Sequence, residues 1–229
     1  MKDSVKRFYE IVATEEEGNY NPASGRLTSL AAATQHHILV AVSNFIRRLN
    51  VSLVLDVGSG PGRYLGVYER NEAFHIMVDG IRPMLLLAKK RAKSAGSLGS
   101  ADFIVADMEK LPIRSSSCDF VSCFDVLHHL ESQEKKSAVG ELARVATEAG
   151  YVFLEIKNKM FLHYMIGISR RNPTGVSKAS SYFSIRAFFQ DSGFREVYSV
   201  GAWPWGLAPK VVSPSILMGF RRRVLGKNS

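Results

Sequence analysis

The residues best suited to bind a ligand form a glycine turn after an apolar run, and they are Asp56, Gly58, Ser59, Gly60 and Gly62. Glycine has no Cβ atom, so such a turn lets backbone N–H groups approach a ligand closely. The spacing here is Gly-x-Gly-x-Gly, whereas dinucleotide-binding proteins use Gly-x-Gly-x-x-Gly. The turn therefore indicates a nucleotide-like ligand, and its spacing argues against the pyrophosphate of NAD.

Three further carboxylates, Asp79, Asp107 and Asp125, each follow a short apolar segment. If these segments are parallel strands of one sheet, the carboxylates lie with the glycine turn along one edge. Open sheets of this kind bind ligands at the carboxyl ends of their strands. The sequence therefore predicts one binding site that contains the turn and all three carboxylates.

Two adjacent histidines, His128 and His129, come shortly after Asp125. A histidine beside a binding site can take a proton from an oxygen or nitrogen nucleophile. The alternative is an exposed or helix-capping pair without a chemical role. Both histidines are kept as candidate catalytic residues, and we expect no metal site.

The segments that position these residues alternate between strand and helix. Apolar runs predict five strands, at 51–57, 74–79, 103–106, 118–124 and 150–156. Helical patterns separate several of them, at 62–70, 83–93 and 132–147, and another precedes them at 27–49. This alternation predicts a parallel sheet with helices on both faces and right-handed crossovers.

The pattern changes after residue 156. Two late strands, 194–200 and 215–224, predict a hairpin at one edge of the sheet. The arginine run 221–223 would then protect an edge strand from pairing with another chain. We expect a single domain over residues 1–229, made of a helical lid (1–50), a core (51–156) and an acceptor-side segment (157–229).

Charge is distributed unevenly along the 229 residues. The chain carries 30 Lys and Arg against 21 Asp and Glu, a net charge of +9. Residues 1–150 hold 18 of each sign, so residues 151–229 hold 12 basic and 3 acidic residues, and the whole excess falls there. A local basic field suggests an anionic partner. An ordinary basic surface is the alternative.

No long apolar stretch and no secretory signal are present, so we expect no stable membrane insertion. The two cysteines, Cys118 and Cys123, are five residues apart in a predicted strand, which would turn them to opposite faces. We interpret them as buried free thiols, which favours a cytoplasmic location.

Four features in order resemble the class I S-adenosylmethionine-dependent methyltransferases. They are the segment Asp56–Gly62, then Asp79 at 21 residues after Gly58, then Ala106-Asp107-Met108 followed by Leu111-Pro112, and lastly the segment Asp119–Leu130. The resemblance covers about residues 50–155. It implies S-adenosylmethionine as cofactor and a Rossmann-like α/β fold. The expected sheet is mostly parallel and seven-stranded, with helices on both faces and an antiparallel C-terminal edge hairpin.

The same resemblance implies roles for individual residues. Gly58 and Gly60 would approach the methionine part of the cofactor, and Asp79 would accept hydrogen bonds from the ribose hydroxyls. The adenine would contact the pair Asp107 and Met108, and the floor would be Phe124 and Asp125. Asp56, Ser59, Gly62, Gly80 and Ile81 complete the expected set. Ile81 replaces a usual polar residue, which removes a helix cap and leaves Arg82 or the turn at Pro83 to compensate.

The sequence specifies the methyl acceptor less closely than it specifies the cofactor. Apolar and aromatic residues after 156 favour an O, N or C nucleophile of a small or lipid-like molecule, and the basic last third is compatible with an anionic one. The basic last third favours the alternative of tRNA or another RNA, and a non-catalytic cofactor-binding partner subunit is a second alternative. Oligomeric state is left open. Candidate walls of the acceptor pocket are Tyr9, Tyr20, 160–168, Trp203 and Trp205.

Overall fold

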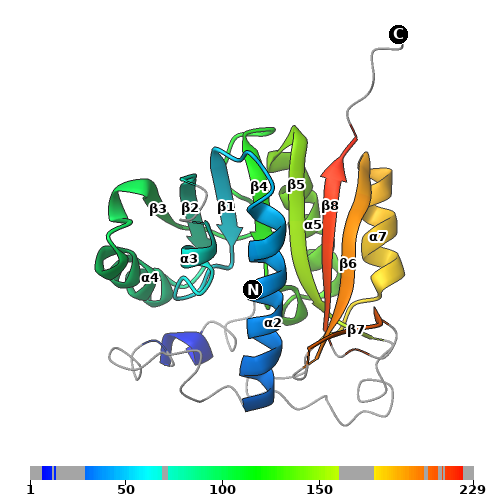
Figure 1. Cartoon of the computed structure of the whole chain (residues 1–229), viewed down its shortest axis with the longest axis horizontal. Helices are drawn as coiled ribbons and strands as arrows, with labels where there is room; N and C mark the ends of the chain where they lie inside the picture. The colour runs from blue at the N-terminus through cyan, green and yellow to red at the C-terminus, as the bar shows by residue number, and fades with distance from the viewer. Residues whose placement is uncertain are drawn as a thin grey trace.

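A computed structural model describes residues 7–11, 13, 29–68, 72–159, 178–203, 206–210, 213 and 215–223. Its centre is one sheet of eight strands in the order β3-β2-β1-β4-β5-β8-β6-β7 (Figure 1). Tyr20, residues 160–168 and Trp205 lie outside the described residues, so their expected roles are not addressed.

The first five strands are parallel to one another. They are β1 (Leu53–Val57), β2 (Phe74–Asp79), β3 (Ala101–Val105), β4 (Cys118–Cys123) and β5 (Ala146–Lys157). The chain moves outward from β1 to β3 and then returns to place β4 on the other side of β1. Such a reversal of strand order opens a crevice at the carboxyl ends of the neighbouring strands.

The last three strands are antiparallel and are β6 (Phe194–Trp203), β7 (Gly206–Ala208) and β8 (Ser215–Arg222). The expected mostly parallel sheet with antiparallel C-terminal strands is confirmed, but the strand count is eight rather than seven. The additional strand, β7, has three residues within a stretch rich in Trp, Pro and Gly. A strand this short shows no apolar periodicity in the sequence.

The two late strands β6 and β8 pair antiparallel as expected, but β8 is not an edge strand, because it lies between β5 and β6. Its arginines therefore have a different role. The guanidinium of Arg221 lies 5.3 Å from the ring centre of Tyr151, and that of Arg222 lies 4.9 Å from the ring centre of Phe194. These contacts are cation–π interactions with the neighbouring strands, so the arginines do not guard an edge.

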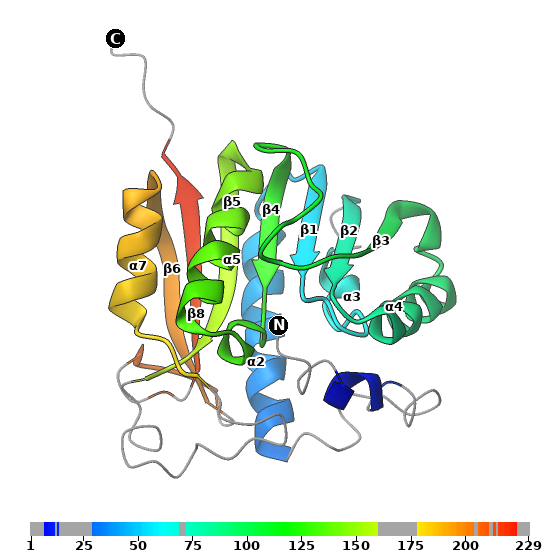
Figure 2. The same ribbon diagram turned by 180° about the vertical axis from the view of Figure 1, so that it is seen from behind.

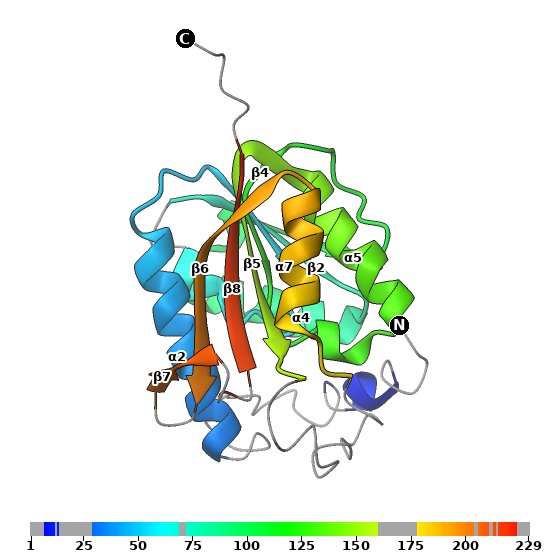
Figure 3. The same cartoon turned by 90° about the vertical axis from the view of Figure 1, so that its right-hand side faces the viewer.

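Helices cover both faces of the sheet. The longer ones are α2 (Ser29–Ile46), α4 (Arg82–Ala95), α5 (Ser132–Val145) and α7 (Tyr182–Asp191), and the short ones are α3 (Leu65–Tyr68), η2 (Leu98–Ser100) and η3 (Leu127–His129). Figure 3 shows α2 on one face and α5 and α7 on the other. No helix among the described residues combines the length and apolar character needed to cross a membrane.

Side chains of the central strands enter two large core clusters, one on each face of the sheet. On the α2 face, Ile38 and Val42 pack in one cluster with Phe120 and Phe153. The opposite face carries a second cluster to which α5 and α7 contribute residues such as Leu142. Burial on both sides explains why these central strands are almost continuously apolar.

Cys118 and Cys123 are free and buried, as expected, but they do not face opposite sides. Both belong to the core cluster on the α5 face. The pairing register of β4 with β5 shifts between Cys118 and Phe120. Cys118 and Phe120 enter different core clusters although they are two residues apart, so the regular alternation of β4 does not extend to Cys118.

Candidate active site

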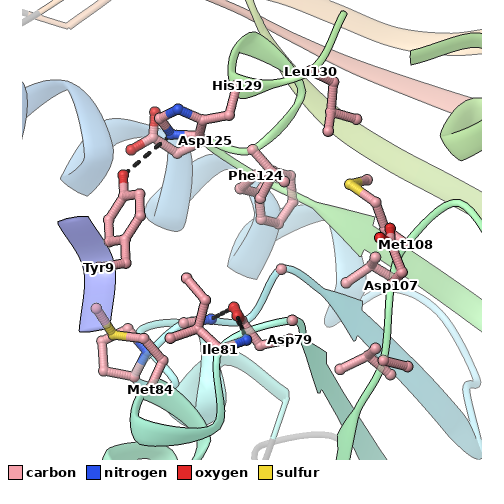
Figure 4. A pocket seen from close by; sticks show the side chains of 18 of the residues that line it. Tyr9, Asp79, Ile81, Met84, Asp107, Met108, Phe124, Asp125, His129 and Leu130 are labelled. Atoms are coloured by element: carbon pink, nitrogen blue, oxygen red, sulfur yellow. Dashed lines mark hydrogen bonds between the residues drawn. The ribbon is translucent and has the colours of Figure 1, made fainter. Parts of the chain in front are cut away.

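A pocket of about 810 Å³, including space open to solvent, lies at the carboxyl ends of the parallel strands. Figure 4 shows side chains from several of these strand ends converging on it. Most of the expected cofactor residues line it, together with one of the two histidines: Gly58, Gly60, Asp79, Gly80, Ile81, Asp107, Met108, Phe124, Asp125 and His129.

The glycine turn after β1 requires glycine for different reasons at different positions. Gly58, Gly60 and Gly62 all have positive φ angles, of 70°, 52° and 75°. A Cβ atom on Gly58 would lie 2.3 Å from Cγ2 of Val126, whereas one on Gly60 would meet no heavy atom within 4 Å. Gly58 therefore permits close packing against the loop after β4, and Gly60 leaves open space beside the backbone.

Asp79, at the end of β2, ties this turn to the next helix. Its Oδ2 accepts a hydrogen bond from the Gly60 N–H at 2.8 Å, and its Oδ1 accepts one from the Ile81 N–H at 2.8 Å. Burial raises the pKa of Asp79, and the two backbone hydrogen bonds oppose that shift. Each carboxylate oxygen has a second lone pair, so Asp79 can still accept from a ligand in the pocket.

The hydrogen bond from Ile81 to Asp79 also corrects the expectation about the start of α4. Ile81 occupies the N-cap position and makes no side-chain cap. The expected compensation by Arg82 or Pro83 was incomplete, because the carboxylate of Asp79 binds the Ile81 N–H itself. One residue thus fixes both the glycine turn and the entry to α4.

Asp56 lies behind the turn rather than in the pocket. Its Oδ1 accepts a hydrogen bond from Ser122 at 2.8 Å, and the Ser122 hydroxyl also bonds that of Tyr68 at 2.7 Å. Its Oδ2 is buried and has no hydrogen-bond partner among the described residues. Burial raises the pKa of Asp56 to about 7, with the Ser122 hydrogen bond opposing the shift. Its surroundings are thus those of a structural group.

The two histidines differ in their access to the pocket. His129 lines it and forms a 3.1 Å hydrogen bond between its Nε2 and the Tyr9 hydroxyl (Figure 4). His128 is buried beside Asp125 and does not line it. Burial lowers the pKa of both rings, most strongly for His128. Both are therefore neutral at pH 7, and only His129 can meet a ligand there.

Asp125 joins the pocket to a buried polar cluster, defined as Asp125, Lys157, Glu155, Gln35 and Tyr64. The ammonium of Lys157 lies 2.9 Å from Asp125 and 2.8 Å from Glu155. Gln35 donates to Glu155 at 3.2 Å and accepts from the Tyr64 hydroxyl at 3.0 Å. The chain of contacts connects α2, the turn before α3, the end of β4 and the end of β5.

The buried polar cluster determines the ionisation state of Asp125. Burial alone would raise the pKa of Asp125, but attraction to the positive charges of Lys157 and Arg63 outweighs burial and lowers it. The two carboxylates likewise raise the pKa of Lys157 against the effect of burial. Asp125 also has a positive φ of 59°, which aspartate tolerates better than most residues. The cluster therefore holds Asp125 ionised at the pocket wall.

Four of the predicted site residues fall outside the pocket lining, namely Asp56, Ser59, Gly62 and His128. Sequence reasoning missed several that do line it, such as Arg63, Met84, Val126 and Leu130. Val126 and Leu130 lie just before and just after the two histidines. Their position in the same turn could therefore have indicated that they line the pocket. Among the described residues, no group of His, Cys, Asp and Glu is suited to hold a metal ion.

The strand order and the site together define a Rossmann-like fold of the nucleotide-binding class. Its marks are a glycine turn after β1, a carboxylate at the end of β2 and a pocket where the strand order reverses. A solved structure with this fold is magnesium protoporphyrin IX methyltransferase from Synechocystis PCC 6803 with bound SAM. It has a TM-score of 0.72 and 17% identity, covering 97% of this chain and 98% of that chain.

Comparison with protein families gives a more specific assignment. Residues 55–154 match the family model described as "Methyltransferase domain". The matched residues include the glycine turn, Asp79, Asp107 and Asp125, on which the resemblance to the class I S-adenosylmethionine-dependent methyltransferases rests.

Curated relatives carry two different descriptions. One is tRNA (carboxymethyluridine(34)-5-O)-methyltransferase ALKBH8 of Mus musculus, 26% identical over 158 residues, which are 68% of this chain and 22% of that protein. Another is malonyl-[acyl-carrier protein] O-methyltransferase of Marinomonas sp. (strain MWYL1), 34% identical over 102 residues, or 44% of this chain and 36% of that protein. The chain thus spans only a part of the length of these relatives.

Proposed function

We propose that this protein transfers a methyl group from S-adenosylmethionine to a small-molecule or lipid-like acceptor. The observation that carries the proposal is Asp79, which stands at the end of β2, lines the pocket and holds the backbone of Gly60. A carboxylate in this position suits the two hydroxyls of a ribose. S-adenosylmethionine, when bound, would supply the methyl group on its positively charged sulfonium.

The residues present fit an adenosine without phosphates. Asp107 and Met108 line the pocket close to Asp79 and offer a carboxylate and an apolar side chain for the adenine. The open space beside Gly60 suits the methionine part, and Phe124 and Asp125 would form the floor. Asp125, held ionised by Lys157, favours a cationic ligand at this wall.

His129 is the better of the two candidates for proton transfer, because its ring lines the pocket and is neutral. Its Nε2 could take a proton from an acceptor oxygen or nitrogen after the hydrogen bond to Tyr9 is exchanged. Replacing His129 with Ala should lower kcat by roughly 10²-fold or more if it acts as a base. Since in-line positioning can suffice for methyl transfer, an unchanged kcat would remove His129 from the mechanism.

The acceptor class rests on the apolar residues of the pocket lining. Ile81, Met84 and Leu130 are among them, and apolar walls favour a small organic or lipid-like molecule. The matching O-methyltransferase described for an acyl-carrier protein, and the similar fold of the protoporphyrin enzyme, agree with this class. A cytoplasmic location remains a prediction from the two free thiols.

A tRNA acceptor is the second candidate function. It is favoured by the relatives described as tRNA methyltransferases and by the net charge of +9. The division of the chain into lid, core and acceptor-side segment stays a prediction, and it is compatible with both candidate functions. A third candidate is a non-catalytic partner subunit. It would bind S-adenosylmethionine in the same pocket but would not transfer the methyl group.

The experiment that tests the function is incubation with S-adenosylmethionine labelled on the methyl group and fractionated cell extract. Label in a small metabolite or lipid fraction would support the first candidate, and label in tRNA would support the second. Cofactor binding without any labelled product, in extracts that label well with another methyltransferase, would leave the non-catalytic reading.

A further inference from the structure

A second pocket lies beside the candidate active site, between the N-terminal halves of α5 and α7. We define the lysine pocket by Lys135, Lys136 and Lys159 with the hydroxyl-bearing residues Ser132, Ser181 and Ser184, all of which line it. Its floor is apolar and includes Val139, Ile185 and Phe188. Ser180 lines it as well, so three cations and four hydroxyls around one hollow form a donor-rich surface for an anion.

The lysines of this pocket are not neutralised by the described part of the protein. Among those residues, none of the three lysines forms an ion pair with a carboxylate. The nearby carboxylate of Glu131 is paired with Lys178, and it also accepts from the first turn of α5 as part of a capping box. The pocket therefore combines positive charge with hydroxyl donors.

The environment of Lys135 is consistent with this surplus. Burial, together with the nearby charges of Lys178 and Lys159, lowers its pKa to about 8, while Glu131 acts in the opposite direction. A bound anion would relieve the repulsion between these lysines.

The lysine pocket is connected to the active-site wall through the backbone. The N–H of Lys178 donates to the carbonyl of His128 at 2.9 Å, and the ammonium of Lys135 donates to the carbonyl of Lys178. Ser132 is only three residues after His129, across the start of α5. Figure 2 shows the start of α5 and the segment leading into α7 close together at the same end of the sheet. A group bound in the lysine pocket would thus lie next to an acceptor that enters beside His129.

We propose that the lysine pocket binds a phosphate group of the methyl acceptor and so positions that acceptor at the mouth of the active site. Phosphate matches both the positive charge and the number of hydrogen-bond donors. It can come from a phosphorylated small molecule or from the backbone of tRNA. The inference rests on the proposed function, because it concerns the acceptor of that reaction.

The test compares two triple variants with equal changes in charge. One is Lys135→Ala, Lys136→Ala and Lys159→Ala in the pocket. The matched control is Lys89→Ala, Lys90→Ala and Lys93→Ala, three exposed lysines on α4. Each protein is titrated with bulk tRNA over a range of salt concentrations and with inorganic pyrophosphate. Binding of S-adenosylmethionine and the melting temperature are measured on the same samples.

We expect the pocket variant to bind at least one phosphate probe tenfold or more weakly, and the control variant to change less than threefold. For tRNA, the slope of log K against log salt should fall by about one for each lysine that contacts a phosphate. Weakened tRNA binding alone would assign the phosphate to RNA, and weakened pyrophosphate binding would assign it to a small acceptor.

Equal effects in the two variants, or no binding of either probe by the unaltered protein, would overturn the proposal. Failure of the proposed function has a different signature, because S-adenosylmethionine would then not bind even to the unaltered protein. A pocket variant that melts at the same temperature and binds S-adenosylmethionine normally confirms that any loss of phosphate binding is local.

Discussion

Asp125 lies between the cofactor pocket and the buried polar cluster, and these two regions are held together by different kinds of contact. On the cofactor side, Asp79 holds Gly60 and Ile81 through backbone N–H groups 19 and 2 residues away. In the buried polar cluster on the other side, Gln35 reaches Glu155 across 120 residues. The cofactor side is therefore fixed by local chain geometry, whereas the cluster depends on charges brought together by the whole fold.

This difference predicts different sensitivity to substitution. Backbone hydrogen bonds to a carboxylate at a pocket edge can be exchanged for water when the side chain is shortened. The largely buried ion pair between Lys157 and Asp125 cannot be replaced by water in this way, because removal of one partner leaves the other charge in a medium of low dielectric constant. We therefore expect the cluster to control stability and the cofactor side to control binding.

The largest effect is expected for Lys157→Met, which leaves Asp125 and Glu155 without their shared cation. The free energy of unfolding should fall by roughly 3–5 kcal/mol, measured by urea denaturation. Lys159→Met, an exposed position two residues later, should change it by less than about 0.5 kcal/mol. Similar values for the two variants would show that the cluster does not stabilise the fold.

Substitution of Asp56 should give the next largest effect on the free energy of unfolding, and this effect depends on pH. Its pKa is 3.8 in the unfolded reference and about 7 when folded. The folded protein keeps a proton that the unfolded chain loses, so stability falls as the pH rises from about 4 to 7.

Asp56→Asn cannot titrate and should lack this fall. Relative to the unaltered protein, its unfolding free energy should rise by roughly 2–4 kcal/mol between pH 4 and pH 8. Thermal melts over this range measure the difference, with Asp102→Asn, an exposed carboxylate on β3, as control. Parallel pH profiles for Asp56→Asn and the unaltered protein would contradict the raised pKa.

Two glycines of the cofactor side provide a further, smaller comparison. Gly58→Ala places a Cβ against Val126 and should cost about 2–3 kcal/mol of stability. Gly60→Ala has a similar backbone strain but no steric neighbour, so about 1 kcal/mol is expected. Urea denaturation of both variants distinguishes these values. A cost for Gly60→Ala as large as for Gly58→Ala would mean that backbone strain, and not Val126, is the reason for glycine.

The difference between local contacts in the cofactor pocket and long-range contacts in the buried polar cluster also explains which features the sequence could predict. The glycine turn was recognisable because it directly follows an apolar strand, and Asp79 was recognisable because it ends the next apolar segment. The positions of Asp107 and Asp125 followed from the rule that ligands bind at the carboxyl ends of parallel strands. These local patterns were sufficient for the parallel half of the sheet and most of the pocket lining.

Long-range pairing was not predictable in this way. Nothing near Lys157 in the sequence indicates that it meets Asp125, and Asp56 resembled a ligand contact until Ser122 was placed beside it. The insertion of β8 between β5 and β6 depends on antiparallel pairing that apolar periodicity does not specify. The separation of His128 from the pocket required the conformation of the turn at η3.

The most direct test of the central claim is calorimetric titration of the unaltered protein and Asp79→Ala with S-adenosylmethionine, its demethylated product and NAD. The account predicts that the first two bind and NAD does not. Loss of the Asp79 carboxylate should weaken binding by about 1–3 kcal/mol, or roughly 5- to 150-fold in Kd. Binding of NAD instead, or an unchanged affinity in the variant, would contradict the assignment of this pocket.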